Sequence, residues 1–362
     1  MLTPGVSRAD PSPDKNATQR GRCVRSDRGA CGTSISPRRP VGPGTGCQTD
    51  RVRREYEPPT REILEWVGHR VHARARVTAV APLPGGITAD MDRITVDSPT
   101  GLKDVVLRRW PGEDWTEGLV TREASALAAI RGHGVPAPQL LAMDEDGAET
   151  GVRCTLTSAL TGQPDLTPAD MQSWLGQLAT TQAAIHAVPD HPQTRLDVWY
   201  DNGAPTPSPD QYGVRYRPLD WLADRGLRDA AREAASGPLG DEKVLVHGDY
   251  QHFNVLWCDD RLTGVVDWPN AATGNRGSDV GHCRLNLAVL FDTTTAGDYL
   301  VMYERAAGVR VDRRADLRAL LCFDLEWQRF IPRQVAGRAP LDLAGMPGRV
   351  AAAIRGALDG IG

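Results

Sequence analysis

The chain has 362 residues, of which 40% are hydrophobic and 24% charged, and its formal net charge at pH 7 is −4. This length is enough for two lobes with separate hydrophobic cores. The sequence has no run of eighteen apolar residues, which excludes a membrane-spanning helix, and its N-terminus lacks the apolar core of a signal peptide. Seven cysteines without a Cys-x-x-Cys pair fit structural thiols, among them Cys154, Cys258, Cys283 and Cys322. We therefore expect a cytoplasmic protein with no membrane partner.

Positive charge is concentrated at the N-terminus. Residues 1–57 hold ten Arg and one Lys against six acidic residues, a net charge of +5, so the rest of the chain carries −9. This segment is rich in Gly, Pro, Ser and Thr, and Tyr56 is its only aromatic residue. It cannot bury enough apolar area to offset the entropy lost on ordering. We predict a disordered basic tail; the alternative, which we do not favour, is a basic arm that binds nucleic acid or an acidic surface.

The elements that follow alternate strands with short turns. Thr60 is predicted to cap a helix whose apolar residues share one face. Strands are predicted over residues 77–83, 87–96, 103–109 and 152–160, with Gly85 and Gly86 in the first turn. A helix over residues 115–130 lies between the third and fourth of these strands. The pattern predicts a small lobe of strands and one helix.

The second half of the chain is predicted to be mainly helical. Thr167 and Pro168 suit the start of a helix that buries His186, which we interpret as a core residue. Further helices are predicted from Asp279, a candidate N-cap, through Leu290, and over residues 219–235, 296–307, 313–333 and 347–358.

Residues 244–268 carry the most specific pattern. Three short apolar runs, at 244–246, 255–257 and 262–266, are separated by a polar loop and an Asp-Asp turn, which predicts three strands. The strand ends bring together His247, Asp249, Asn254 and Asp267. Carboxylate and amide oxygens are ligands that suit Mg²⁺ better than zinc.

The spacing His-Gly-Asp-x-x-x-x-Asn, followed by Val-Val-Asp-Trp, resembles the aminoglycoside phosphotransferase and choline kinase-like family. The resemblance covers about residues 60–335. It implies a two-lobed protein kinase-like α+β fold, with a nucleotide-binding lobe over residues 58–160 and a catalytic, substrate-binding lobe over 161–362. It also implies ATP or GTP as phosphate donor, together with Mg²⁺.

The resemblance implies a role for each motif residue. Asp249 would orient the acceptor hydroxyl and take its proton, and His247 would support the loop. Asn254 and Asp267 would hold Mg²⁺, and Asp279 would hold the catalytic loop.

The resemblance also implies the nucleotide contacts. Arg108, at the position of the kinase strand lysine, would contact the α- and β-phosphates and pair with Glu123. Gly85 and Gly86 would cover the phosphates, and backbone groups around Thr157 to Leu160 would meet the adenine edge.

The acceptor is predicted from charge. A net charge of −9 outside the tail favours a cationic small molecule with a hydroxyl group. The resemblance implies that residues 320–327, on a C-terminal helix, contribute to the acceptor pocket. There we expect Asp324, or in second place Glu326, to meet the ammonium group of the acceptor; the alternative is that arginines nearby in sequence pair with Asp324. The sequence thus predicts an O-phosphotransferase for aminoglycosides or related sugars. A metabolic kinase of the choline or homoserine type and a nucleotide-binding pseudokinase are the alternatives.

Overall fold

The computed structural model describes residues 56–83, 89–112, 116, 118–189 and 219–361. Gly85, Gly86 and residues 1–55 lie outside the described residues. No helix in the described ranges is long and apolar enough to cross a membrane.

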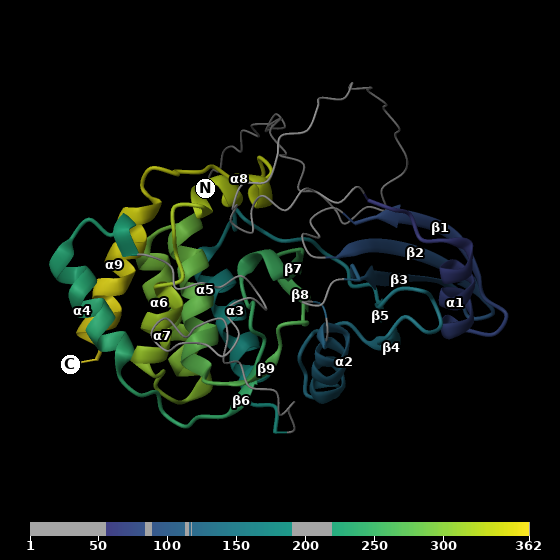
Figure 1. The fold of residues 1–362 in the computed structure, drawn as a ribbon, viewed down its shortest axis with the longest axis horizontal. Coiled ribbons are helices and arrows are strands. Elements are labelled where there is room, and N and C mark those ends of the chain that lie inside the picture. The colour runs from purple at the N-terminus through teal and green to yellow at the C-terminus, as the bar shows by residue number, and fades with distance from the viewer. Residues whose placement is uncertain (1–55, 84–88, 113–115, 117, 190–218, 362) are drawn as a thin grey trace, which may run out of the picture. The chain divides into compact units, whose positions relative to one another are not determined.

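A five-stranded antiparallel sheet forms the N-terminal part (Figure 1). Its strand order is β1-β2-β3-β5-β4. The strands are β1 (Arg76–Pro82), β2 (Asp90–Ser98), β3 (Gly101–Arg109), β4 (Leu140–Asp144) and β5 (Cys154–Ser158). The hairpin between β2 and β3 is in continuous register, from Asp90 opposite Arg109 to Ser98 opposite Gly101. This register fixes which face of β3 each of its side chains occupies.

Helix α1 (Arg61–Val71) covers the sheet with an apolar face. Thr60 caps it as predicted, because its hydroxyl oxygen accepts a hydrogen bond from the Ile63 amide. Trp66 and Val67 pack with residues of β2, β3 and β5 into one buried cluster. Helix α2 (Leu119–Ile130) contacts β4 and β5.

The described chain joins the sheet earlier than the predicted tail boundary. The Tyr56 hydroxyl donates to the buried Asp92 carboxylate. Arg109 donates to that carboxylate at 3.0 Å and to the carbonyl of Glu57. Residues 56 and 57 therefore belong to the folded body.

Seven helices are described in the C-terminal part, with α5 at its centre (Figure 1). They are α3 (Met171–His186), α4 (Arg225–Ser236), α5 (Arg276–Leu290), α6 (Thr293–Ala307), α7 (Arg313–Leu320), α8 (Trp327–Val335) and α9 (Met346–Asp359). Helix α5 is almost wholly buried and packs against α6, α7 and α9. A Cβ at Gly277 or Gly281 would come within 2.6 Å of an α7-side carbonyl oxygen, so these glycines allow close approach.

Two short two-stranded antiparallel sheets flank the polar loop. Strand β6 (Val244–Val246) pairs with β9 (Ala272–Gly274), and β7 (Val255–Cys258) pairs with β8 (Arg261–Val265). Asp259 and Asp260 both have positive φ, 51° and 60°, as a two-residue turn of the hairpin type requires. Three strands were expected here; β9 was not.

Several predicted helix boundaries are wrong. Helix α3 begins at Met171 and is capped by Asp170, not by Thr167. The region predicted as one helix over 219–235 is a 3₁₀ turn, Leu219–Trp221, followed by α4. Helix α5 is capped by Asn275, which precedes Asp279 by one helical turn.

The single helix predicted over 313–333 is interrupted between α7 and α8. Asp324 lies in this interruption, where its carboxylate accepts a hydrogen bond from the Glu326 amide at 2.9 Å. An aspartate that bonds the backbone two residues on competes with the helical hydrogen-bond pattern. The prediction that Asp324 lies on a helix face is therefore wrong.

The cysteines follow the prediction at three of four positions. Cys154 and Cys283 carry buried thiols, and Cys322 carries a half-buried one. Cys258 is disulfide-bonded, so the expectation of a structural thiol is wrong there.

Candidate active site

The polar loop between β6 and β7, residues 247–254, is the centre of the site. Gly248 has φ +78°, and a Cβ at this position would collide with the carbonyl oxygen of Asn270. Only glycine meets both conditions without strain. The loop therefore requires the Gly of the His-Gly-Asp motif.

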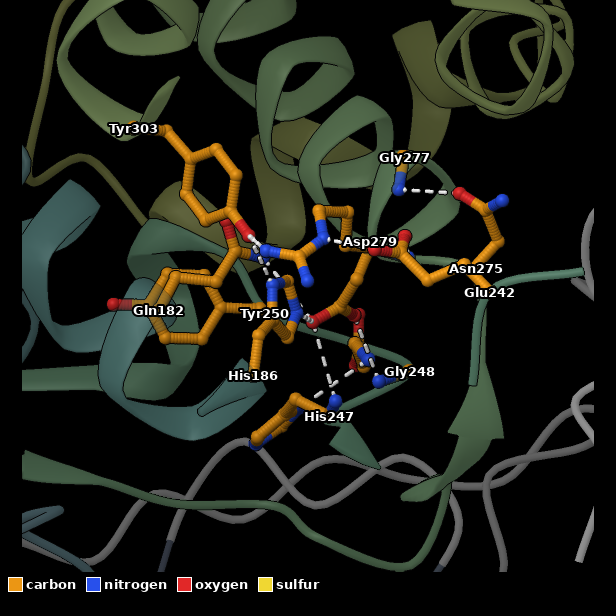
Figure 2. Close-up of polar contacts among 12 residues, drawn as sticks. Gln182, His186, Glu242, His247, Gly248, Tyr250, Asn275, Gly277, Asp279 and Tyr303 are labelled. Atoms are coloured by element: carbon orange, nitrogen blue, oxygen red, sulfur yellow. Dashed lines mark hydrogen bonds and ion pairs between the residues drawn. The ribbon is translucent and has the colours of Figure 1, made fainter. Parts of the chain in front are cut away.

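A buried carboxylate on α5 holds this loop, as Figure 2 shows. Asp279 accepts hydrogen bonds from the backbone amides of His247, at 3.2 Å, and Gly248, at 2.8 Å. It also accepts from the side chains of Gln182 and His186, each at 3.1 Å. Burial alone would raise the pKa of Asp279, but the His186 hydrogen bond and the nearby histidine and backbone donors lower it to about 2. Asp279 is thus anionic at neutral pH, and the sequence analysis assigned it this loop-holding position.

A second layer of polar contacts supports Asp279 (Figure 2). His186 contacts the Tyr303 hydroxyl through Nδ1, and Arg276 donates to the same hydroxyl at 3.4 Å. Arg276 in turn pairs with Glu242. His186 is therefore a buried structural residue, as interpreted from its apolar helix face.

His247 connects the loop to the residue before Asp267. Its Nδ1 accepts from the Asp249 amide at 3.2 Å, so Nε2 carries the proton and donates to the Val266 carbonyl at 3.0 Å. Burial lowers the pKa of His247, which favours this neutral form. The ring also packs on Trp268, with centroids 4.4 Å apart. These contacts give His247 the supporting position that the motif predicted.

Three side chains surround the carboxylate of Asp249. Asn254 Nδ2 donates to Oδ2 at 3.0 Å and to the Asp249 carbonyl at 2.9 Å. Gln251 Nε2 lies 2.7 Å from Oδ1, and His282 Nε2 lies 2.8 Å from the same oxygen. Neither Gln251 nor His282 was predicted from the sequence as a site residue. A signal for His282 existed in its position three residues after Asp279 on one helix.

Asp267 lies beside Asn254 because the intervening backbone is fixed. The Val266 amide donates to the Asn254 carbonyl at 2.9 Å, and Asp267 follows with φ +73°. A non-glycine residue in this conformation is strained, and such strain is concentrated at functional sites. The Asp267 side chain is 38% exposed. It is thus available to a ligand outside the protein core.

Asn254 and Asp267 together suit a magnesium ion. The side-chain nitrogen of Asn254 donates hydrogen bonds to Asp249. The side-chain oxygen of Asn254, Oδ1, is therefore the atom that can bind a cation. Within the described ranges, no group of three or more His, Cys, Asp or Glu residues could hold a metal alone. One carboxylate and one amide oxygen, completed by phosphates and water, is a donor set that fits Mg²⁺.

Arg108 and Glu123 face this site from the N-terminal sheet and α2. Arg108 Nη1 donates to Asp267 Oδ1 at 2.8 Å and lies 3.7 Å from Glu123 Oε1. Thr155 donates to Glu123 at 2.7 Å. Burial raises the pKa of Glu123, and the charge of Arg108 opposes that rise. The predicted Arg–Glu pair therefore exists, but Arg108 is closer to Asp267.

In the segment predicted to contact adenine, Thr157 to Leu160, two of the backbone amides already donate hydrogen bonds within the protein. Thr157 is buried in β5, opposite Val106. The amides of Ser158 and Ala159 donate to Gln139 and Asp104 carbonyls, at 2.8 and 3.1 Å. Backbone contacts to a base would therefore fall to Leu160 and to carbonyl oxygens. The segment is then joined to β7, because Gln163 and Trp257 exchange two backbone hydrogen bonds.

The two acidic residues predicted for the acceptor have local contacts. Asp324 accepts from the Glu326 amide, and the Glu326 carboxylate pairs with Arg329 at 3.0 Å. The arginines proposed as alternative partners bond elsewhere as well: Arg313 to Glu304, Arg314 to the Ala234 carbonyl, and Arg318 to the Ala235 and Gly237 carbonyls.

Comparison with known proteins places this geometry in a family. The model of a family described as "Phosphotransferase enzyme family" matches residues 79–351. A thermostable mutant of aminoglycoside phosphotransferase APH(4)-Ia, solved with AMP-PNP and hygromycin B, is 19% identical, with a TM-score of 0.53; the match covers 82% of this chain and 98% of that one. Macrolide 2′-phosphotransferase MphH from Brachybacterium faecium is also 19% identical, with a TM-score of 0.50 over 81% of this chain and 98% of that one. At these identities the likeness shows the protein kinase-like fold of the family.

One curated relative is similar over a shorter stretch. The Arabidopsis thaliana protein named "Probable acyl-CoA dehydrogenase IBR3" is 24% identical over an alignment of 224 residues, and the match covers 54% of this chain and 26% of that protein. The match thus spans about a quarter of that relative's length.

Proposed function

We propose that this chain, which belongs to the phosphotransferase enzyme family, moves the γ-phosphate of ATP to a hydroxyl group of a small molecule. The observation that carries the proposal is the placement of Asp249, Asn254 and Asp267 around one short loop, with Arg108 reaching Asp267 from the sheet. Two APH(4)-Ia structures of the same fold hold ADP or AMP-PNP, which favours an adenine nucleotide over GTP.

In the proposed reaction, the acceptor oxygen forms a bond to the γ-phosphorus. The bond between that phosphorus and the β–γ bridging oxygen breaks, and the electron pair leaves with the nucleoside diphosphate. Asp249 orients the acceptor hydroxyl and takes its proton. Positioning and charge stabilisation dominate catalysis in this reaction class, so the contacts that fix Asp249 matter as much as its basicity.

The nucleotide phosphates would be contacted from β3 on one side and from the polar loop on the other. Arg108 would contact its phosphates from β3, and its pairing with Glu123 would keep the guanidinium in place. Asn254 and Asp267 would hold Mg²⁺, which would neutralise charge on the β- and γ-phosphates. The neighbouring Trp110 ring, 5.2 Å from the guanidinium carbon, limits the positions that Arg108 can occupy.

For the acceptor, we propose a cationic amino sugar or amino alcohol. The support is the net charge of −9 outside residues 1–57 and the hygromycin B bound beside AMP-PNP in a complex of APH(4)-Ia. Asp324 is the first candidate for the ammonium contact and Glu326 the second. Each carboxylate already accepts one local hydrogen bond or ion pair, so fewer of its lone pairs are open to an ammonium group. A cytoplasmic location suits such an enzyme.

The IBR3 relative suggests a second acceptor class. Its name refers to acyl-CoA chemistry, and a hydroxyacyl thioester is a small molecule with a hydroxyl group. Coenzyme A is anionic, so the two acceptor classes respond oppositely to salt. Screening should raise the KM of a cationic acceptor and lower that of an anionic one.

The test is a transfer assay with radiolabelled ATP and Mg²⁺ against matched acceptors. The panel would contain hygromycin B, choline, homoserine and a hydroxyacyl-CoA, each at two salt concentrations. Transfer to a cationic acceptor, with KM rising with salt, is expected. A neutral or anionic best acceptor would overturn the cationic-acceptor proposal, and no transfer to any hydroxyl compound, with nucleotide bound normally, would favour a pseudokinase.

A further inference from the structure

A histidine outside the His-Gly-Asp-x-x-x-x-Asn motif contacts the carboxylate that we propose as the proton acceptor. His282 Nε2 lies 2.8 Å from Asp249 Oδ1, and both side chains are largely buried, with 13% and 23% of their surface exposed. A carboxylate at neutral pH only accepts hydrogen bonds, so Nε2 is the donor. The inference drawn from this contact rests on the function proposed above.

His282 lies on α5, a helix that is almost wholly buried. It follows Asp279 by three residues on α5, so the two side chains leave neighbouring positions of the helix surface. Asp279 grips the backbone of the loop at His247 and Gly248, while His282 reaches the Asp249 side chain. Because Gly281 lets the other side of α5 approach α7 closely, the helix has little room to shift.

The hydrogen bonds of Asp249 are unevenly divided between its two oxygens. A carboxylate offers about four lone-pair positions, two on each oxygen. Oδ1 receives Gln251 Nε2 and His282 Nε2, whereas Oδ2 receives Asn254 Nδ2. Oδ1 is therefore filled, and one position on Oδ2 is left for a further donor.

We propose that His282 is a positioning residue that, with Gln251, occupies Oδ1 and so makes Oδ2 the oxygen that takes the proton of the acceptor hydroxyl. The acceptor O–H bond breaks as its oxygen attacks the γ-phosphorus, and the proton is transferred to Oδ2. His282 neither touches the acceptor nor accepts the proton. Its contribution is to keep the carboxylate from rotating away from the attacking oxygen.

The proposal is tested with two substitutions at one position. His282→Leu keeps a side chain of similar bulk but removes the donor. His282→Gln places an amide N–H close to the former Nε2. His133→Leu is the matched control, because His133 is exposed in the turn after α2. For each variant, kcat, the KM values for ATP and acceptor, and the melting temperature are measured.

We expect His282→Leu to lower kcat about 10- to 100-fold, the loss typical of a misplaced catalytic group, with little change in the KM for ATP. His282→Gln should recover most of that loss, and the control should match the wild type. Equal kcat losses in both His282 variants with a lowered melting temperature would reduce His282 to a packing residue and overturn the proposal. Wild-type kcat in His282→Leu, while Asp249→Asn is impaired, would overturn it and leave the proposed function intact. Wild-type kcat in Asp249→Asn would overturn both.

A spectroscopic measurement tests the contact without turnover. Side-chain ¹⁵N shifts of His282, assigned by their disappearance in His282→Gln, report which ring nitrogen carries a proton. The geometry requires a protonated Nε2 in the wild type. An unprotonated Nε2 at neutral pH would show that the bond to Asp249 is absent in solution, and the proposal would fail whatever the kinetics.

Discussion

Arg108 and Asp267, 159 positions apart in the sequence, are joined by a 2.8 Å hydrogen bond. Through it the third strand of the sheet meets the residue that follows the β7–β8 hairpin. Arg108 is also 3.7 Å from Glu123, so one buried guanidinium faces two carboxylates. In the proposed reaction Asp267 would hold Mg²⁺ and Arg108 would contact the nucleotide phosphates, so this bond joins the two sides of the proposed nucleotide site.

Replacing Arg108 by Lys should distinguish the contribution of its charge to ATP binding from that of its planar guanidinium group. Lysine keeps the positive charge but cannot offer two planar N–H groups at once. We expect the KM for ATP to rise about tenfold, roughly the worth of one charge-assisted hydrogen bond, with a smaller change in the KM for the acceptor. Arg93→Lys, in the exposed pair with Asp104, is the control. An unchanged KM for ATP in Arg108→Lys would remove Arg108 from the nucleotide site.

The buried Asp279 should make the fold sensitive to acid. Its pKa is about 2 in the folded protein and near its ordinary value of 3.8 in the unfolded chain. Because the folded pKa is the lower one, the stabilisation is complete above about pH 4. It is lost as the pH falls from about 4 to 2.

The measurement is the free energy of unfolding against pH in the wild type and in Asp279→Asn. The wild type should lose about 2 kcal/mol more than the variant across that interval, since one pKa unit corresponds to roughly 1.4 kcal/mol. The variant itself should be less stable at pH 7, because two backbone donors and His186 lose a charged acceptor. Parallel curves for the two proteins would contradict the low pKa.

Gly248 should tolerate no side chain. With φ +78° and the Asn270 carbonyl in the way of a Cβ, Gly248→Ala combines backbone strain with a steric clash. We expect at least about 2 kcal/mol of destabilisation and loss of phosphate transfer. Gly297→Ala is the control, since a Cβ there meets nothing within 4 Å in α6; it should stabilise by about 0.5–1 kcal/mol. A stable, active Gly248→Ala protein would contradict the loop geometry.

The boundary of the folded body can be tested by two truncations. A chain that starts at Tyr56 keeps the Tyr56–Asp92 hydrogen bond and the Glu57 carbonyl that accepts from Arg109. A chain that starts at residue 58 lacks both. The shorter chain should be less stable by about 1–3 kcal/mol, the usual range for bonds to a charged group, as measured by denaturant unfolding. Equal stability would place the boundary at residue 58, as the sequence suggested.

The sequence predicted that the motif residues lie close together, because they belong to one loop and its flanking strands. His247, Asp249 and Asn254 are brought together by local chain geometry, and the β7–β8 hairpin returns Asp267 to them. Asp279 was found through the family resemblance, not through its own pattern. Four of the five strands of the N-terminal sheet were also predicted, since turn residues separate them; β4 (Leu140–Asp144) was not predicted.

Contacts between distant elements were not predictable in the same way. His282 reaches Asp249 because α5 packs beside the loop; its spacing of three residues from Asp279 places both on one helix face, but the sequence does not report which loop that face meets. Asp324 was predicted to lie on a helix because its apolar neighbours have helical spacing, but α7 ends at Leu320 and the Asp324 carboxylate bonds the Glu326 amide just before α8. Strand β9 is three residues long and is defined by its pairing with β6, so its local sequence carries little signal.

The most direct test of phosphoryl transfer is the kcat of Asp249→Asn with Mg²⁺, ATP and the best acceptor of the panel. Asparagine keeps the size of the side chain but does not take a proton, so kcat should fall about 10²- to 10⁴-fold, the usual contribution of a general base. The melting temperature and ATP binding should stay close to those of the wild type. Undiminished kcat in this variant would contradict the account, because no other residue is proposed to accept the proton.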